Sequence, residues 1–110
     1  MSKVYVTQEV FSADYSDAQR YGDVVFLTAS EVSMASQSLH NVKLVEQIRR
    51  GLHRYDPEVD HVAPSGSPII TGLVFAILSE KTHRFNVLKW NGRDQCYAAV
   101  TISTKGGSDE

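Results

Sequence analysis

Apolar and polar residues follow one another along the first 63 positions in patterns that predict three strands. Residues 3–9 alternate between the two classes with the two-residue period of a half-buried strand. Residues 24–28, VVFLT, form the short unbroken apolar run that is typical of a strand buried on both faces. Residues 59–63 predict a third, shorter strand.

The C-terminal part of the chain predicts a hairpin. Two extended segments, residues 83–90 and 95–103, are rich in β-branched and aromatic side chains. Asn91 and Gly92 stand between them, and this dipeptide is the strongest short hairpin signal because both residues tolerate a positive φ. Residues 105–110, KGGSDE, predict a disordered tail.

Residues 39–55 predict an amphipathic helix, because the spacing of apolar residues changes there to three or four positions. Ser38 precedes this helix as an N-cap. Asp56-Pro57 ends it, since proline lacks an N–H and restricts the residue before it. The apolar face consists of Val42, Val45, Ile48, Leu52 and Tyr55.

A second helix is predicted over residues 69–78. Ser67 is placed to cap it, and Pro68 is placed at its first turn, where a missing N–H costs nothing. Apolar side chains cover almost every side of this segment, so we expect the helix to be buried all round.

Two polar segments have weaker patterns. Residues 12–21, SADYSDAQRY, predict either a loop or a single helical turn. Residues 29–38 are rich in serine and alanine and predict a long loop, with a short helix around residues 31–35 as an alternative.

The predicted order β-β-α-β-α-β-β indicates a single small α/β domain over residues 1–104. Strand-helix-strand units give parallel strands joined by crossovers, and the hairpin returns the last strand antiparallel. We therefore expect a mixed sheet of about five strands with two main helices. The first strand is expected either at an edge of the sheet or beside the second strand.

This topology predicts where a small ligand would bind. Ligands of open parallel sheets lie beyond the carboxyl ends of the strands. Two serine-rich loops leave that edge, residues 28–38 and residues 63–67. The second also opens a helix, whose free N–H groups favour an anion. The candidate residues for a phosphorylated ligand or nucleotide are Ser65, Gly66, Ser67, Thr28 and Ser30. The structural alternative is that Ser67 caps the helix and Gly66 forms a turn.

Basic residues on the first helix suggest a second kind of surface. Lys43, Arg49, Arg50 and Arg54 could contact an acidic partner or the phosphates of a nucleic acid, or they could be simply solvated. Trp90 in the hairpin could anchor an interface, and its alternative is a structural cross-strand pair with Tyr97. Exposed sheet edges also make a homodimer a candidate assembly.

Composition narrows the classes of function. The chain has 110 residues and a net charge of −2, which argues against a dedicated nucleic-acid coat and ranks nucleic acid below a protein partner. Its single cysteine, Cys96, allows no internal disulfide and favours a reducing compartment. The N-terminus lacks the pattern of a signal peptide, and no apolar run reaches membrane-spanning length. We expect a cytoplasmic protein that does not bind a membrane.

Candidate chemistry is sparse. The histidines do not share a metal-ligand spacing, and the acidic residues around Asp56 resemble a solvated loop more than a metal site. Ser65 lacks the G-x-S-x-G turn of a serine nucleophile. We therefore expect no cofactor and no metal, and enzymatic activity is the less favoured interpretation.

The second half of the chain resembles small uncharacterised proteins of tailed phages and related mobile elements. The resemblance lies in Tyr55-Asp56-Pro57, in Asp60, in residues 66–68 at the start of the apolar helix, and in residues 88–91, LKWN. Ser67 and Asn91 stand where aspartate is usual, and both substitutions keep cap and turn chemistry. The resemblance implies a phage accessory protein in a bacterial cytoplasm, one that binds and modulates a host protein without catalysis.

Overall fold

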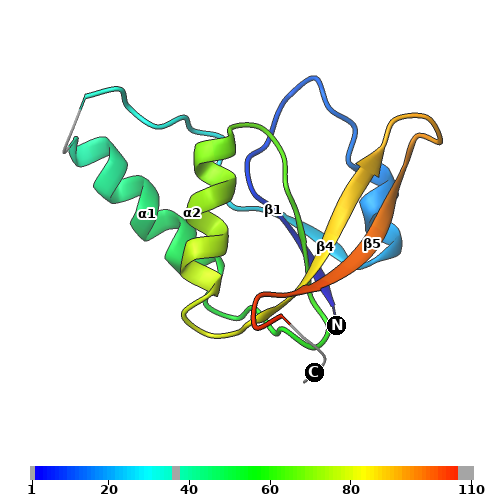
Figure 1. Ribbon diagram of the computed structural model, residues 1–110. Coiled ribbons are helices and arrows are strands. Elements are labelled where there is room, and N and C mark those ends of the chain that lie inside the picture. The colour runs from blue at the N-terminus through cyan, green and yellow to red at the C-terminus, as the bar shows by residue number, and fades with distance from the viewer. Residues whose placement is uncertain (1, 36–37, 107–110) are drawn as a thin grey trace.

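The computed structural model describes residues 2–35 and 38–106 as one small α/β domain (Figure 1). The fold class is as predicted. The elements in chain order are β1 (Lys3–Val6), the 3-10 helix η1 (Ser16–Arg20), β2 (Asp23–Phe26), α1 (Leu39–Gly51), β3 (His61–Ala63), α2 (Pro68–Leu78), β4 (Arg84–Asn91) and β5 (Cys96–Ser103).

The strands form a five-stranded sheet in the order β2-β1-β3-β4-β5. The strands β1 to β4 are parallel, and β5 returns antiparallel to β4 through the predicted hairpin. Val4 pairs with Val24 on one side and with His61 on the other. The first strand therefore lies beside the second, as one of the two alternatives had it, and it is not an edge strand. The edges belong to β2 and β5.

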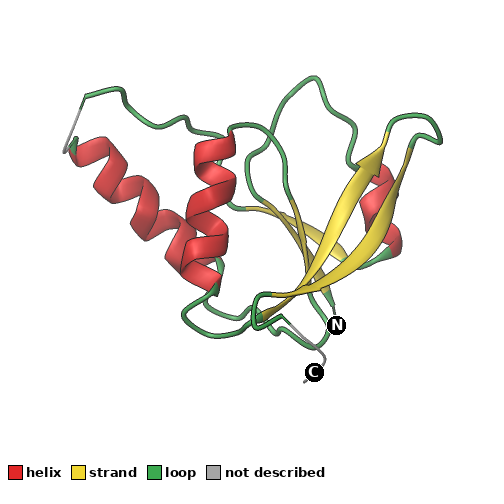
Figure 2. Cartoon of the chain, viewed as in Figure 1, coloured by secondary structure: helices red, strands yellow, loops and turns green. Residues whose placement is uncertain are grey.

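Both long helices cover the same face of the sheet, and η1 lies on the opposite face (Figures 1 and 2). Successive side chains of a strand point to opposite faces of the sheet, so Tyr5 faces the helices whereas its neighbours Val4 and Val6 face η1. The main core lies between the helices and the sheet, and it includes Leu44, Ile48, Leu52, Val62, Ile70, Val74 and Phe85. The smaller core under η1 includes Ala18, Ala63, Leu88 and Tyr97.

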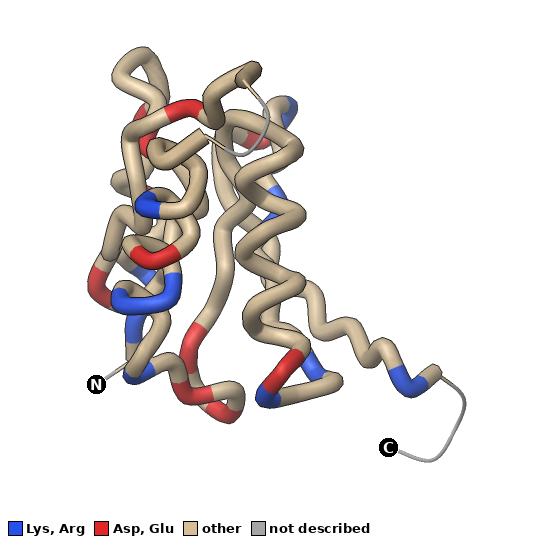
Figure 3. The backbone as a smooth tube through the Cα atoms, turned by 90° about the vertical axis from the view of Figure 1, so that its left-hand side faces the viewer, with Lys and Arg blue, Asp and Glu red and all other residues tan. Residues whose placement is uncertain are grey.

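The second helix is buried on one side only, which corrects the expectation of burial all round. Ile70, Val74 and Leu78 are fully buried, whereas Ile69 is 59% exposed. The sheet and α1 pack against one side of this helix, and apolar residues remain on its outer side. Figure 3 shows α2 in tan throughout, because its sequence PIITGLVFAIL carries no charge, while α1 carries several Lys and Arg residues.

Several predicted boundaries shift by a few residues. The first helix ends at Gly51 rather than at Tyr55, because the N–H groups of His53 and Tyr55 bond the carbonyls three residues back and tighten the chain into turns. The third strand begins at His61, since the N–H of Asp60 bonds the carbonyl of Asp56 in a turn. The single helical turn predicted within residues 12–21 is present as η1.

Residues 31–35 form no helix, so the loop alternative holds for this segment. Residues 36–37 of the predicted loop and residues 107–110 of the predicted tail lie outside the described residues. Within the described ranges, none of the helices has the length and apolar character needed to cross a membrane.

Candidate functional site

The S-G-S-P turn is built as a helix start. The side chain of Ser67 accepts a hydrogen bond from the N–H of Ile69 at 3.2 Å, and Pro68 occupies the first turn of α2. Gly66 has a φ of +78°, and a side chain at this position would collide with the carboxamide of Gln8. The predicted capping role of Ser67 and turn role of Gly66 are therefore confirmed.

Gln8 fills the space between the two serine-rich loops. This side chain is 3% exposed. Its Oε1 accepts from the N–H of Ser67 at 2.6 Å, and its Nε2 donates to the carbonyl of Ser30 at 3.0 Å. The loops do converge at the carboxyl edge, as the topology predicted, and a residue of the chain itself holds them together. A phosphorylated ligand at Ser65, Gly66 and Ser67 stays a prediction, and it would have to displace this amide.

Neighbouring hydroxyl groups complete the same network. Thr7 Oγ1 accepts from the N–H of Ser65 and donates to the Ser65 carbonyl, both at 2.8 Å. Thr28 is buried, its Oγ1 accepts from the N–H of Ser30 at 2.9 Å, and it donates to Gln47 at 3.2 Å. These contacts make the predicted ligand residues part of a connected structural network.

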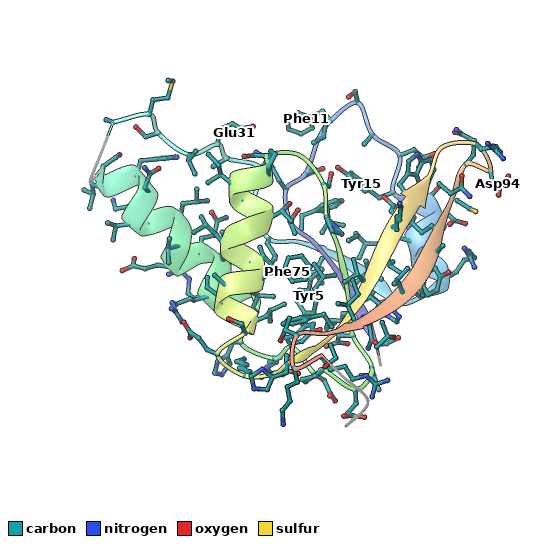
Figure 4. The ribbon with its side chains drawn as sticks, in the orientation of Figure 1. Tyr5, Phe11, Tyr15, Glu31, Phe75 and Asp94 are labelled. Atoms are coloured by element: carbon teal, nitrogen blue, oxygen red, sulfur yellow. The ribbon has the colours of Figure 1, made fainter. Side chains whose placement is uncertain are left out.

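A pocket of about 520 Å³ opens beside this network, on the face of the sheet that carries η1. We name it the Tyr97 pocket. Three segments build it: the loop after β1 with the start of η1, the chain after β3, and the end of the hairpin. Figure 4 shows Tyr15 between the loop after β1 and the β4–β5 hairpin. The lining residues are Ser12, Ala13, Asp14, Tyr15, Ser16, Asp17, Pro64, Ser65, Trp90, Gln95 and Tyr97.

Aromatic rings form the fixed walls of the Tyr97 pocket. Trp90 and Tyr97 are register partners on β4 and β5, and their rings meet edge to face with centroids 4.9 Å apart. The Tyr15 hydroxyl lies 2.8 Å from the Ser65 Oγ and accepts from the N–H of Val10 at 2.8 Å. These partners hold the Tyr15 ring in one orientation.

The 3-10 helix fixes the third wall by acting on the backbone of Tyr97. Asp17 accepts from the N–H of Tyr97 at 2.7 Å, and Arg20 donates to its carbonyl at 2.8 Å. Arg20 also donates to Asp17 at 2.9 Å. This pair bonds the outward peptide groups of an edge strand as a neighbouring strand would. We name it the Asp17–Arg20 clamp.

Tyr97 is 6% exposed and lines the pocket. Its hydroxyl keeps contact with solvent, unlike the Tyr55 hydroxyl, which is fully buried without a partner. Burial raises the pKa of Tyr97, and the neighbouring Tyr15, Asp17 and Asp14 raise it further. Burial disfavours any charged group, whereas the two aspartates oppose a bound anion and favour a cation.

The predicted partner residues come together only in part. Lys43 and Arg50 line a pocket of about 310 Å³ with Ser30 and His40, and Arg50 also lines a smaller pocket with Arg54. The two terminal nitrogens of Arg49 each donate to a carboxylate oxygen of Glu80 at 2.9 Å, which ties α1 to the end of α2.

Trp90 lies apart from these basic residues, in the wall of the Tyr97 pocket, and Ser65 is the one predicted ligand residue that also lines that pocket. The paired rings of Trp90 and Tyr97 confirm the structural cross-strand reading of Trp90, while its role as an interface anchor stays a prediction.

Sequence reasoning did not single out Gln8, Asp14, Tyr15 or Asp17. The polar segment SADYSD carried the only signal, a tyrosine flanked by aspartates within a predicted turn. Its position against the hairpin depends on a contact between residues 80 apart in the chain. Within the described chain, no group of three or more His, Cys, Asp or Glu side chains is placed to hold a metal ion.

Comparisons with known proteins identify a family. No curated protein and no solved structure matches the chain. The model of the family described as phage Pam3 gp32-like protein matches residues 2–104, and this match confirms the resemblance to uncharacterised phage proteins. Because the match extends over nearly the whole of the 110 residues, the chain belongs to the phage Pam3 gp32-like protein family.

Proposed function

We propose that this phage protein binds a host protein without catalysing a reaction, and that the Tyr97 pocket is the recognition site. The observation that carries the proposal is a pocket whose Trp90 and Tyr97 rings are already held edge to face by their pairing across the hairpin. Trp90 stands at the rim and is 42% exposed. Tryptophan and tyrosine dominate the energetics of protein interfaces, and a preorganised site loses little entropy on binding.

The polar groups of the pocket suit binding better than turnover. The Asp17 carboxylate is engaged by Arg20 and by the Tyr97 N–H, and the Ser65 hydroxyl is bonded to Tyr15. A nucleophilic serine needs a general base within hydrogen-bond reach, and no histidine of the described chain lines this pocket. Tryptophan and tyrosine side chains, which this pocket contains, are instead among the residues most enriched at interface hot spots.

Affinity capture from a lysate of the bacterial host tests the proposal. The tagged wild-type protein should retain one host protein in stoichiometric amount, and Trp90→Ala should lose it. Met34→Ala is the matched control, because Met34 is fully exposed and lies outside the pocket. Retention of the same partner by Trp90→Ala, or recovery of chaperones alone, would contradict the proposal.

A second candidate function is the binding of a phosphorylated ligand, and the basic pocket on α1 favours it. Ser30, Lys43 and Arg50 surround about 310 Å³ there, so a hydroxyl and two cationic side chains converge. A nucleotide at one hundred times its dissociation constant should stabilise the protein by about 2.7 kcal/mol. The melting temperature should then rise by roughly 10 °C, and Arg50→Glu should abolish the rise. Unchanged melting across a nucleotide panel would remove this candidate.

A further inference from the structure

We propose that the Tyr97 pocket accepts a basic side chain, a lysine or an arginine presented by the partner. The inference deepens the proposed function and rests on it. It depends on three properties of the pocket: the sign of its charge, the faces of its aromatic rings and the position of one hydroxyl.

The charge of the pocket is negative. Two carboxylates line it, those of Asp14 and Asp17, and the lining includes no lysine or arginine. Arg20 balances Asp17, so Asp14 supplies the uncompensated charge. Asp14 Oδ1 accepts from the N–H of Ser16 at 2.9 Å, and this bond lowers the pKa of Asp14 below its ordinary value. The Asp14 carboxylate is therefore ionised at neutral pH, and a cation in the pocket would find it unpaired.

The aromatic walls give a cation a second source of attraction. An ammonium or guanidinium group is attracted to the face of an aromatic ring, most strongly to tryptophan. Trp90 and Tyr97 meet edge to face, so the ring that presents its edge keeps both of its faces uncovered by its partner. Neither ring is paired with a cation in the described chain, in contrast to Tyr21, which lies under Arg20.

The Tyr97 hydroxyl supplies the directional contact. A basic side chain has only donors, and a phenol oxygen can accept from one of them. The Tyr97 residue is almost wholly buried while its hydroxyl keeps contact with solvent, and a hydrogen bond from a charged donor is stronger than one from a neutral donor. A phosphate would meet the Asp14 carboxylate and be repelled. A pocket of about 520 Å³ lies within the range of known ligand sites, about 300–1,000 Å³.

The single tryptophan of the chain makes the test direct, because Trp90 reports its own environment by fluorescence. The probe is the peptide acetyl-Gly-Gly-Lys-Gly-Gly-amide. The same peptide with arginine tests the second cation, and the same peptide with norleucine keeps the chain and removes the charge. We expect a saturable change with lysine or arginine and binding about tenfold weaker with norleucine.

Three variants separate the contributions. Asp14→Asn removes the charge and should weaken lysine binding about threefold, and added salt should reproduce part of that loss. Tyr97→Phe removes one oxygen atom, keeps the ring, and should weaken binding by a similar factor. Asp23→Asn is the control, an exposed aspartate on β2 outside the pocket, and should bind as the wild type does. Thermal melts verify that each variant is folded.

Two results would overturn the inference. One is equal binding of the norleucine peptide or of methyl glucoside, which would mean that the pocket does not select charge. The other is the absence of a saturable response to both basic peptides up to about 10 mM. If the host partner still depends on Trp90 in that case, the proposed function stands and only the basic ligand is wrong. If the peptides bind while capture is independent of Trp90, the proposed function fails instead.

Discussion

Replacing Gln8 by alanine should destabilise the protein more than its position in a loop suggests. The side chain is 3% exposed and makes two hydrogen bonds to backbone groups of different loops, at 2.6 and 3.0 Å. Each lost bond costs about 1 kcal/mol, and each backbone group left unsatisfied adds to that cost. The expected loss is about 2–4 kcal/mol of the free energy of unfolding, which corresponds to a fall of roughly 10 °C in melting temperature.

Urea unfolding at 25 °C measures this loss as a shift of the midpoint at constant slope. Gln19→Ala on the surface of η1 is the matched control and should change little. Gln8→Glu should lie between the two, because it keeps an acceptor for Ser67 near the N-terminus of α2 but loses the donor to Ser30. A midpoint for Gln8→Ala equal to that of the control would refute the view that Gln8 holds the loops together.

Four further predictions concern single positions. Gly66→Ala should destabilise by at least about 1 kcal/mol, because φ is +78° and the new methyl would meet the Gln8 carboxamide. Gly72 lies in the middle of α2, where an added Cβ would meet nothing within 4 Å beyond the neighbouring residues and the helix's own backbone. Gly72→Ala should therefore stabilise by about 0.5–1 kcal/mol in the same denaturation assay; the opposite order would contradict both assignments. The Tyr55 hydroxyl is buried without a partner, and burial raises its pKa to about 12, so the fold favours the neutral phenol. The free energy of unfolding should therefore fall as pH rises from 10 toward 12. A Tyr55→Phe variant that shows the same fall would exclude this cause. Asp17→Ala should free the N–H of Tyr97 at the edge of β5 and increase aggregation, measured by light scattering; an unchanged signal would mean that the Asp17–Arg20 clamp is not what protects this edge.

The elements of the fold could be predicted because their causes are local. Ser67-Pro68 opens a helix through bonds within two residues, and the Asn91-Gly92 signal marks the hairpin without reference to the rest of the chain. The end of the first helix at Gly51 could not be predicted, since the spacing of apolar residues continues to Tyr55 although the backbone has already left the helix. The spacing of apolar residues indicates which side chains are buried. It does not indicate where the backbone hydrogen bonds change from partners four residues apart to partners three residues apart.

The candidate site could be predicted only in part because its causes are distant. A pocket does lie at the carboxyl edge, and Ser65 and Trp90 border it. Nothing in the sequence indicated that Gln8 occupies the predicted phosphate position, because a glutamine after a strand looks like any other polar loop residue. The Tyr97 pocket likewise needs the segment after β1 to reach the hairpin, and neither residue spacing nor composition encodes that contact.

The connection between β1 and β2 has a consequence for the order of folding. These strands are neighbours, yet the segment between them reaches β5 at the far edge of the sheet before it returns. The loop-closure entropy of joining Asp17 to Tyr97 is offset only when the strands between them are in place. The Tyr97 pocket should therefore be among the last parts of the protein to form and the first to open. Only a molecule in which all five strands have paired would then be able to bind a partner at this pocket.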